Sequence, residues 1–301
     1  MNHYRTKNIT YKNEDFGFSV KIPEDYAQTM LPEDLNHPLN LQFLPSEHER
    51  YKDGLVDPLQ EVSTTTPPGL LHKYPHRVLL TLTQACAIHC RYCFRRHFPY
   101  TDENPFKNLN LILEYITKDE SIHEIILSGG DPLMLSNQKL KKLFDALKKI
   151  SHIKTIRLHT RMPMIVASRI DSFIQSLPKK YDFWQWVVVL HINHDSEFNV
   201  ENNDALHQLS QNHFTVLNQS VLLKGVNDNL KALVDLSNAL WKRKVLPYYL
   251  HQLDPVKQGM HFKVSDEVAK SLYQQLQGSL PGYLVPKLAQ EIPGLKHKLL
   301  I

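Results

Sequence analysis

The sequence predicts an α/β fold in which a parallel sheet is wrapped by helices. Three observations favour this class. Short β-rich apolar runs alternate with longer amphipathic runs from about residue 77 onward. Six such β-then-α units follow one another, which is typical of parallel strands joined by crossover helices. The β-rich runs are apolar on both faces, as the strands of a buried parallel sheet are.

Each predicted strand is a short apolar run, and each predicted helix has apolar residues at i, i+3, i+4 and i+7. In chain order the strands are expected at 78–83, 125–127, 156–159, 187–190, 216–223 and 247–250. The helices are expected at 109–117, 140–147, 170–177, around 206–209, at 230–240 and at 268–276. Leu140, Leu143, Phe144 and Leu147 give the clearest helical face.

Periodicity alone leaves two architectures open, a doubly wound open sheet and a partial barrel. In both, the carboxyl ends of the strands would carry the functional site. The first 65 or so residues lack the β-then-α alternation and are richer in proline and charge. We therefore expect an N-terminal extension over 1–65 packed on the barrel, a barrel over 66–281 and a C-terminal segment over 282–301.

Composition excludes several classes of protein. The chain has 301 residues, 42% of them hydrophobic and 22% charged, with a mean hydropathy of -0.36, as in globular proteins. No apolar run reaches the roughly 18 residues of a membrane span, and the polar amino terminus does not resemble a signal peptide. There are 3 cysteines, too few and too close together for a disulfide framework. We expect a reducing, cytoplasmic location.

The charge balance is only mildly basic, at +4. The densest positive segment contains Arg91, Arg95, Arg96 and His97, beside the cysteines. Such a segment is either a solvated basic loop or a binding site for an anion. A metal-stabilised RNA-binding protein that uses this segment is one alternative function.

The cysteines directly follow the first predicted strand. Cys86, Cys90 and Cys93 have the spacing CxxxCxxC. Three thiolates leave an open position on a metal centre, and open positions are where chemistry occurs. A zinc site completed by His89, His97 or a distant histidine is an alternative. A redox pair of Cys90 and Cys93 is another, but such a pair has no use for Cys86.

The cysteine loop resembles that of radical S-adenosylmethionine (SAM) enzymes. The wider stretch CRYCFRRHFPY, the SGGDPL segment and the VPKL segment together resemble the lysine 2,3-aminomutase family. The likeness is strongest to its short branch, which serves the modification of elongation factor P. It extends from about Asp57 to Lys298. The resemblance implies a (β/α)6 partial TIM barrel of the radical SAM type, which settles the choice that periodicity leaves open.

The resemblance also implies two cofactors at this end of the sheet. The three cysteines would bind three irons of a [4Fe-4S] cluster, and the fourth iron would take the amino and carboxylate groups of SAM. As bare sequence, the Gly-Gly-Asp-Pro segment is more often just a turn. Residues at family positions near SAM are Ser128, Gly129, Gly130, Asp131, His191 and Gln219.

A third implied cofactor is pyridoxal 5′-phosphate (PLP). In the family, a lysine shortly after a Gly/Pro turn forms the Schiff base with PLP, and Lys298 in the C-terminal segment matches it. The flanking residues depart from the family pattern, so Lys296 remains a rival. Lys73, Tyr74 and Arg77 match the stretch that binds the phosphate of PLP, although such residues alone could be a polar start of a strand.

Three further residues match family positions that bind the substrate. Arg95 would hold the amino-acid carboxylate, for which a bidentate guanidinium is suited. Asp254 and Glu291 would hold the ε-ammonium of lysine, and Glu291 replaces the usual Asp. The implied activity is a lysine 2,3-aminomutase, an isomerase that converts L-α-lysine to β-lysine by a radical mechanism.

The resemblance implies partners as well. The enzyme would need an external electron donor, and its β-lysine would be attached to elongation factor P by a separate ligase. We expect no direct contact with nucleic acid or membrane. Longer family members carry a C-terminal extension with additional cysteines for zinc, so we expect no zinc here. Within enzymes, the alternative is an aminomutase that acts on free lysine or another amino acid in metabolism.

Overall fold

The computed structural model describes residues 17–301 except 32, 63–65 and 100–104. Its centre is a nine-stranded sheet whose strands lie in chain order, from β1 at one edge to β9 at the other. The seven strands from β2 to β8 are parallel, and each edge strand is antiparallel to its neighbour. Because the sheet keeps two edges, the barrel is partial, and the predicted fold class is confirmed.

The elements have the following bounds. The strands are β1 Leu70–Tyr74, β2 Arg77–Thr83, β3 Glu124–Gly129, β4 Thr155–His159, β5 Gln185–Leu190, β6 Thr215–Val221, β7 Leu246–His251, β8 Lys287–Gln290 and β9 Leu299–Leu300. The helices are α1 Glu24–Ala27, α2 Pro38–Phe43, α3 Leu109–Lys118, α4 Asn137–Leu147, α5 Met162–Ile165, α6 Ser172–Lys180, α7 Val200–Gln211, α8 Leu230–Lys242 and α9 Asp266–Ser279. Short 3-10 turns, η1 to η6, lie between them.

All six predicted strands and all six predicted helices are present, as β2 to β7 and as α3, α4 and α6 to α9. Five of these helices begin at a side chain that caps the first free N–H groups, which explains where they start. The capping residues are Ser136, Asp171, Asn199, Asn229 and Ser265. Strands β1, β8 and β9 were not predicted, because polar residues interrupt the apolar pattern of β1 and β8 and because β9 has only two residues.

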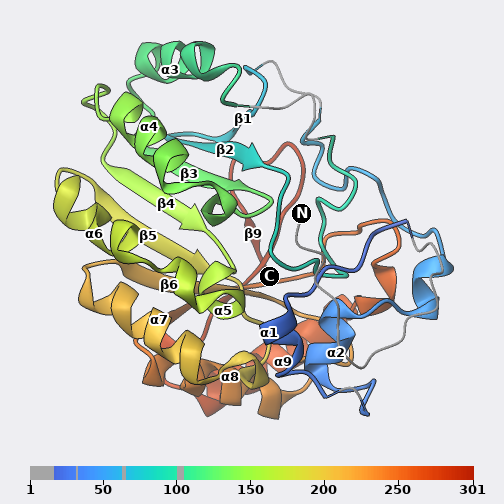
Figure 1. Ribbon diagram of the computed structural model, residues 1–301. Coiled ribbons are helices and arrows are strands. Elements are labelled where there is room, and N and C mark those ends of the chain that lie inside the picture. Colours follow the sequence, from blue (N-terminus) through green and yellow to red (C-terminus); the bar gives the residue numbers. More distant parts are fainter. Residues whose placement is uncertain (1–16, 32, 63–65, 100–104) are drawn as a thin grey trace.

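The core lies between the sheet and the outer helices. Figure 1 shows these helices along one side of the sheet, while the N-terminal segment lies on the side toward which the strand arrows point. Ile125, Leu127 and Ile156 of the strands are fully buried, as are Ile116 and Phe144 of the helices facing them. The apolar face of each helix therefore covers the sheet, and the carboxyl ends of the strands stay available for a site.

The N-terminal segment is packed against the barrel where the structure describes it. Ile22, Tyr26, Leu39 and Phe43 are buried in the same apolar cluster as the strands and helices of the barrel. The boundaries predicted for the three parts of the chain, at 65/66 and 281/282, stay predictions. Within the described residues, no helix is both long and apolar enough to cross a membrane.

Candidate active site at the carboxyl ends of the strands

The three cysteines occupy the loop after β2. All three are free thiols. Burial raises the pKa of Cys86 and raises that of Cys93 to about 11, and neighbouring cysteine thiols add to both shifts. Cys86 and Cys93 therefore carry protons that a metal centre would displace on binding. Three unpaired thiols in one loop, with the spacing CxxxCxxC, are a donor set that fits a [4Fe-4S] cluster held by three cysteines.

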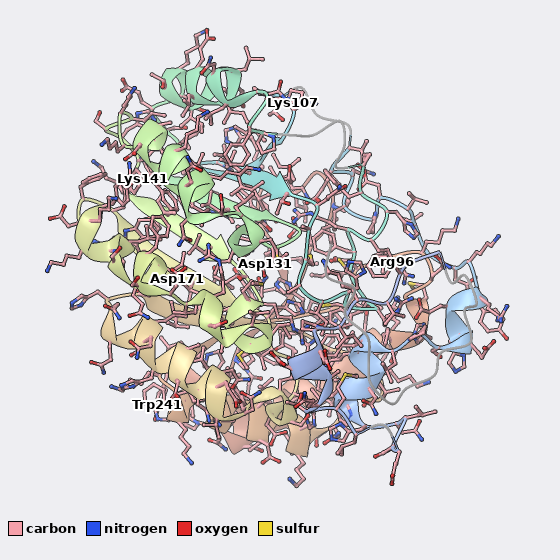
Figure 2. The ribbon with its side chains drawn as sticks, in the orientation of Figure 1. Arg96, Lys107, Asp131, Lys141, Asp171 and Trp241 are labelled. Carbon is pink, nitrogen blue, oxygen red and sulfur yellow. The ribbon has the colours of Figure 1, made fainter. Side chains whose placement is uncertain are left out.

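The arginines of this loop are buried. Arg91 and Arg96 both bind the carboxylate of Glu49, at 2.5 and 2.9 Å, and Arg95 binds Glu61 at 2.7 Å. Figure 2 shows Arg96 away from the outer helices that carry residues such as Lys141 and Trp241. The interpretation as a solvated basic loop is therefore wrong, because the positive charges are enclosed and compensated. The alternative of an RNA-binding surface depended on exposed arginines in this segment, and these arginines are not exposed.

The Gly-Gly-Asp segment at the end of β3 is bonded to the backbone that leads into the cysteine loop. The N–H of Gly130 donates to the carbonyl of Thr83 at 2.6 Å, and that of Asp131 to the carbonyl of Ala85 at 2.9 Å. A Cβ on Gly130 would lie 2.5 Å from the Ala85 carbonyl oxygen, so only glycine permits this approach. The glycines thus let the end of β3 pack directly against the start of the cysteine loop. The sequence alone did not show this role.

Asp131 organises the neighbouring strand end. Its buried carboxylate accepts hydrogen bonds from the Thr160 hydroxyl at 2.8 Å and from the backbone N–H groups of Arg161 at 2.8 Å and Leu133 at 3.0 Å. Burial raises the pKa of Asp131, while these hydrogen bonds oppose the shift. Its assignment to SAM binding stays a prediction.

A buried polar network adjoins Cys90. Arg161, after β4, donates to the Cys90 sulfur at 3.1 Å and to the Tyr92 hydroxyl at 2.6 Å, and it pairs with Glu197. His191, after β5, lies 3.0 Å from the same hydroxyl and stacks on the Tyr92 ring. Burial lowers the pKa of His191, so the ring is neutral near pH 7. Gln219 lies on the neighbouring strand β6, half-buried. Sequence reasoning missed Arg161, although it directly follows a predicted strand.

The C-terminal segment brings Lys298 between the end of β8 and the rings of Tyr74 and Tyr249. Its ammonium pairs with the carboxylate of Glu291, and the Tyr74 hydroxyl donates to that carboxylate at 2.6 Å. Burial would raise the pKa of Glu291, but Lys298, Tyr74 and Lys73 outweigh it and lower the pKa to about 2. Lys296, by contrast, is exposed. The geometry therefore favours Lys298 over Lys296 as the lysine of the site.

The residues predicted to bind phosphate adjoin this lysine. Lys73 lies 3.6 Å from Glu291, and the guanidinium of Arg77 covers the Tyr74 ring at 4.5 Å from its centroid. Two cations and a hydroxyl near a half-buried lysine amine are a donor set that fits PLP, whose phosphate and aldehyde need these groups.

Asp254 lies in the loop after β7 and is half-buried. Burial and then the charge of Glu291 raise its pKa to about 7, which Lys298 and Lys73 oppose. The two acids predicted to share an ammonium are thus near enough to influence each other. At neutral pH one is ionised and the other is half protonated.

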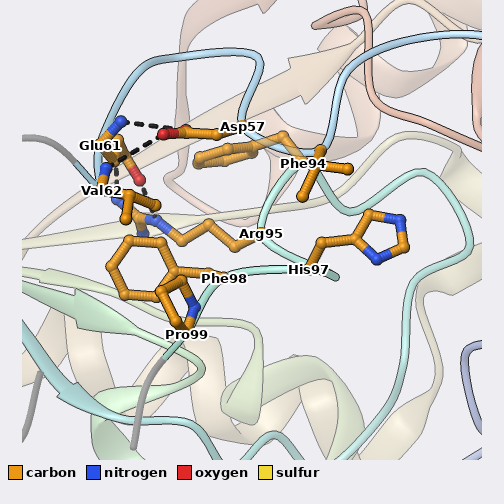
Figure 3. Close-up of a pocket in the computed structure, with 9 residues that line it drawn as sticks. Asp57, Glu61, Val62, Phe94, Arg95, His97, Phe98 and Pro99 are labelled. Atoms are coloured by element: carbon orange, nitrogen blue, oxygen red, sulfur yellow. Dashed lines mark hydrogen bonds and ion pairs between the residues drawn. The ribbon is translucent and has the colours of Figure 1, made fainter. Parts of the chain in front are cut away.

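Arg95 faces a cavity of about 270 Å³ that Figure 3 shows in close-up. Its guanidinium binds the Glu61 carboxylate through Nε at 2.7 Å and Nη2 at 3.0 Å, and Nη1 donates to the Ser128 hydroxyl at 3.1 Å. Burial would raise the pKa of Glu61, but Arg95 and Lys73 hold it below its ordinary value. Sequence reasoning missed Glu61, because a single acid outside any periodic run carries no signal.

Two histidines inside the barrel were also missed. His159 ends β4, and the buried Nε2 of its ring has no hydrogen-bond partner among the described residues. Burial and then the charges of Arg157, Lys298 and Arg95 lower its pKa. Burial and Lys298 lower the pKa of His251 to about 3. An unsatisfied, neutral nitrogen beside these groups is a second observation that fits a bound ligand inside the barrel.

Comparison with known proteins gives consistent results. The profile of the radical SAM superfamily matches residues 80–236. The chain is 42% identical to an L-lysine 2,3-aminomutase of Buchnera aphidicola over 94% of this chain and 84% of that protein. It is 43% identical to an L-lysine 2,3-aminomutase of Haemophilus influenzae, with the same shares of both chains covered.

Among solved structures, the fold is similar to that of native anSMEcpe with bound AdoMet and a peptide. The TM-score is 0.50 and the identity 13%, over 66% of this chain and 57% of that one. At this identity the likeness concerns the fold alone, and it agrees with the open barrel described above.

Proposed function

Because the chain belongs to the lysine 2,3-aminomutase family of the radical SAM superfamily, we propose that it converts L-α-lysine to β-lysine. Membership of the superfamily implies a [4Fe-4S] cluster, SAM and an electron donor. PLP is part of the proposal. SAM would supply the radical and PLP the group that carries the migrating amine, while the protein binds and orients the reactants.

The observation that carries the proposal is the position of Lys298, which lies near both an acidic and a basic side chain. Lys298 pairs with Glu291, next to Lys73 and Tyr74. A lysine that forms a covalent bond with PLP needs a protected place near phosphate-binding cations. If Lys298 held PLP, its amine would no longer pair with Glu291, and that carboxylate would be available to a substrate cation.

Lysine as the substrate is supported by two acids and one arginine. Glu291 and Asp254 would bind the ε-ammonium, and Arg95 would bind the α-carboxylate with its planar guanidinium. The relatives reported above carry the printed name L-lysine 2,3-aminomutase. We assign the three cysteines to the cluster and the Ser128 to Asp131 segment, with His191 and Gln219, to the surroundings of SAM.

The fate of the product is a separate proposal. The likeness to the short branch of the family supports transfer of β-lysine to elongation factor P by a separate ligase. Mass spectrometry of elongation factor P from cells that lack this chain tests it, because the β-lysyl adduct should disappear. An unchanged adduct would instead favour an aminomutase of free amino-acid metabolism.

Turnover of lysine is the direct test of the activity. Anaerobically reconstituted protein with SAM, PLP and a reductant should convert L-lysine to β-lysine, measured by chromatography and mass spectrometry. Reactions without SAM and without PLP are the controls, and both should be inactive. Conversion of another amino acid in place of lysine would contradict the roles given to Asp254 and Glu291.

Substrate affinity should depend on pH through Asp254. Its pKa is raised to about 7, so the carboxylate is increasingly protonated as the pH falls below 7, and a protonated acid does not attract an ammonium. The KM for lysine should therefore rise about tenfold per pH unit below 7 and level off above it. Kinetics from pH 5.5 to 8.5 measure this profile, and in Asp254→Asn it should be flat. A wild-type profile without this slope would show that Asp254 does not bind the substrate.

A further inference from the structure

Glu61 contacts two cationic side chains, Lys73 and Arg95, that bind different groups under the proposed function. Its Oε1 lies 3.0 Å from the ammonium of Lys73 and 3.0 Å from Nη2 of Arg95, while its Oε2 lies 2.7 Å from Nε of Arg95. Lys73 is assigned to the phosphate of PLP and Arg95 to the carboxylate of lysine. One carboxylate therefore contacts both anion-binding groups at once.

The position of Glu61 is itself fixed. The side chain is 5% exposed, and the carboxylate of Asp57 accepts hydrogen bonds from the backbone N–H groups of Glu61 at 2.9 Å and Val62 at 3.0 Å. Figure 3 shows these bonds beside the ion pair with Arg95. Earlier in the same segment, Leu55 exchanges backbone hydrogen bonds with Pro255 and Lys257. A carboxylate anchored in this way imposes its geometry on flexible lysine and arginine side chains.

The spacing of these cations matters for a chemical reason. During the proposed reaction the substrate is covalently joined to PLP, so the phosphate and the α-carboxylate belong to one molecule and their separation is limited. Two adjacent cations, one buried (Arg95) and one half-buried (Lys73), would repel each other and move apart without a compensating charge. An error of about 1 Å in the placement of reacting groups costs about 10²-fold in rate.

We propose that Glu61 is a positioning residue that sets the separation and orientation of Lys73 and Arg95, and so aligns the cofactor-bound substrate for reaction. This inference rests on the proposed function. A different role is conceivable, in which Glu61 is a substitute anion that the substrate must displace from Arg95. The anchoring by Asp57 favours the positioning role, and the two roles predict opposite kinetics.

The test is Glu61→Gln in the fully reconstituted enzyme. Glutamine keeps the size of the side chain but removes the charge that holds both cations. We expect kcat to fall about 10²-fold, whereas the KM for lysine changes little, because Arg95 keeps its charge. The visible circular dichroism of bound PLP, which reports its orientation, should change, while the iron content stays at the wild-type level. Unchanged kcat with a lower KM would overturn the proposal in favour of the displaced anion.

Two further variants separate positioning from charge and from folding. Glu61→Asp keeps the charge but is one methylene too short to bridge both cations, so it should also be slow; wild-type kcat in this variant would overturn the proposal. Asp145→Asn removes a carboxylate that also lies between two cations, Lys141 at 2.5 Å and Lys148 at 3.5 Å, but on the outer helix α4, and it should keep wild-type kinetics. If Glu61→Gln and Asp145→Asn lose thermal stability equally and neither changes kcat, Glu61 is merely structural.

Failure of this inference differs from failure of the proposed function. A wild-type enzyme that neither binds PLP nor converts lysine overturns both. A wild-type enzyme that does both, together with a Glu61→Gln variant of equal kcat and equal PLP dichroism, overturns the positioning role alone.

Discussion

A Cys90→Ala variant should lose its iron-sulfur cluster and all turnover of lysine. Cys90 is one of three free thiols in the loop after β2, and a cluster bound through three cysteines cannot replace a missing ligand from a chain that has 3 cysteines in total. Iron should fall from about four per chain to a trace, and the visible absorbance of the cluster should disappear. Anaerobic purification followed by iron and sulfide analysis measures the effect.

The matched controls are His89→Ala and His97→Ala. Both residues lie in or next to the cysteine loop and are the nearby candidates for the fourth ligand of a zinc site. In the structure, Nδ1 of His89 lies 2.8 Å from the carbonyl of Ser19, which is a structural use of the ring. Both variants should keep the full iron content. Loss of metal from either, or zinc in place of iron in the wild type, would contradict the cluster assignment.

Lys298→Ala should abolish covalent attachment of PLP. Borohydride reduction of the wild type should fix PLP on Lys298, because its amine lies among Glu291, Lys73 and Tyr74. Turnover should fall by roughly 10²–10⁴-fold, the range expected when a group that also transfers protons is removed. Peptide mapping of the reduced protein locates the label.

Two variants control for the ion pair with Glu291 and for the neighbouring lysine. Lys298→Arg keeps a cation beside Glu291 but cannot form the bond to PLP, so it should fold like the wild type and remain inactive. Lys296→Ala removes an exposed lysine and should keep both label and turnover. A label on Lys296 in the wild type would overturn the assignment.

The sequence predicted the parallel strands and their helices because each is defined by its own neighbours. Leu140, Leu143, Phe144 and Leu147, for instance, specify a helix face without reference to the rest of the chain. The last two strands of the sheet escaped prediction for the opposite reason. Strand β8 has four residues and β9 two, and such short elements exist only because a neighbouring strand supplies hydrogen-bond partners.

The residues of the site likewise fall into those that the sequence predicts and those that it does not. The cysteines carry a local spacing that indicates a metal centre by itself. Glu61 and His159 carry none, because the function of each depends on residues distant in the sequence: Glu61 meets Arg95 34 positions later, and His159 acquires its surroundings only when Lys298 arrives from the other end of the chain. Contacts of this kind follow from the three-dimensional arrangement of the strands and not from a pattern in the sequence.

The pairing of Leu55 with the backbone around Val256 has a consequence for selectivity. It ties the segment that carries Glu61 to the loop that carries Asp254, so the clamp for the carboxylate and the acid for the ammonium are parts of one hydrogen-bonded unit. Under the proposed function, the distance between Arg95 and Asp254 is then fixed. A substrate must have a matching distance between its carboxylate and its side-chain ammonium. An amino acid one methylene shorter than lysine, such as ornithine, could contact Arg95 or Asp254 but not both at once.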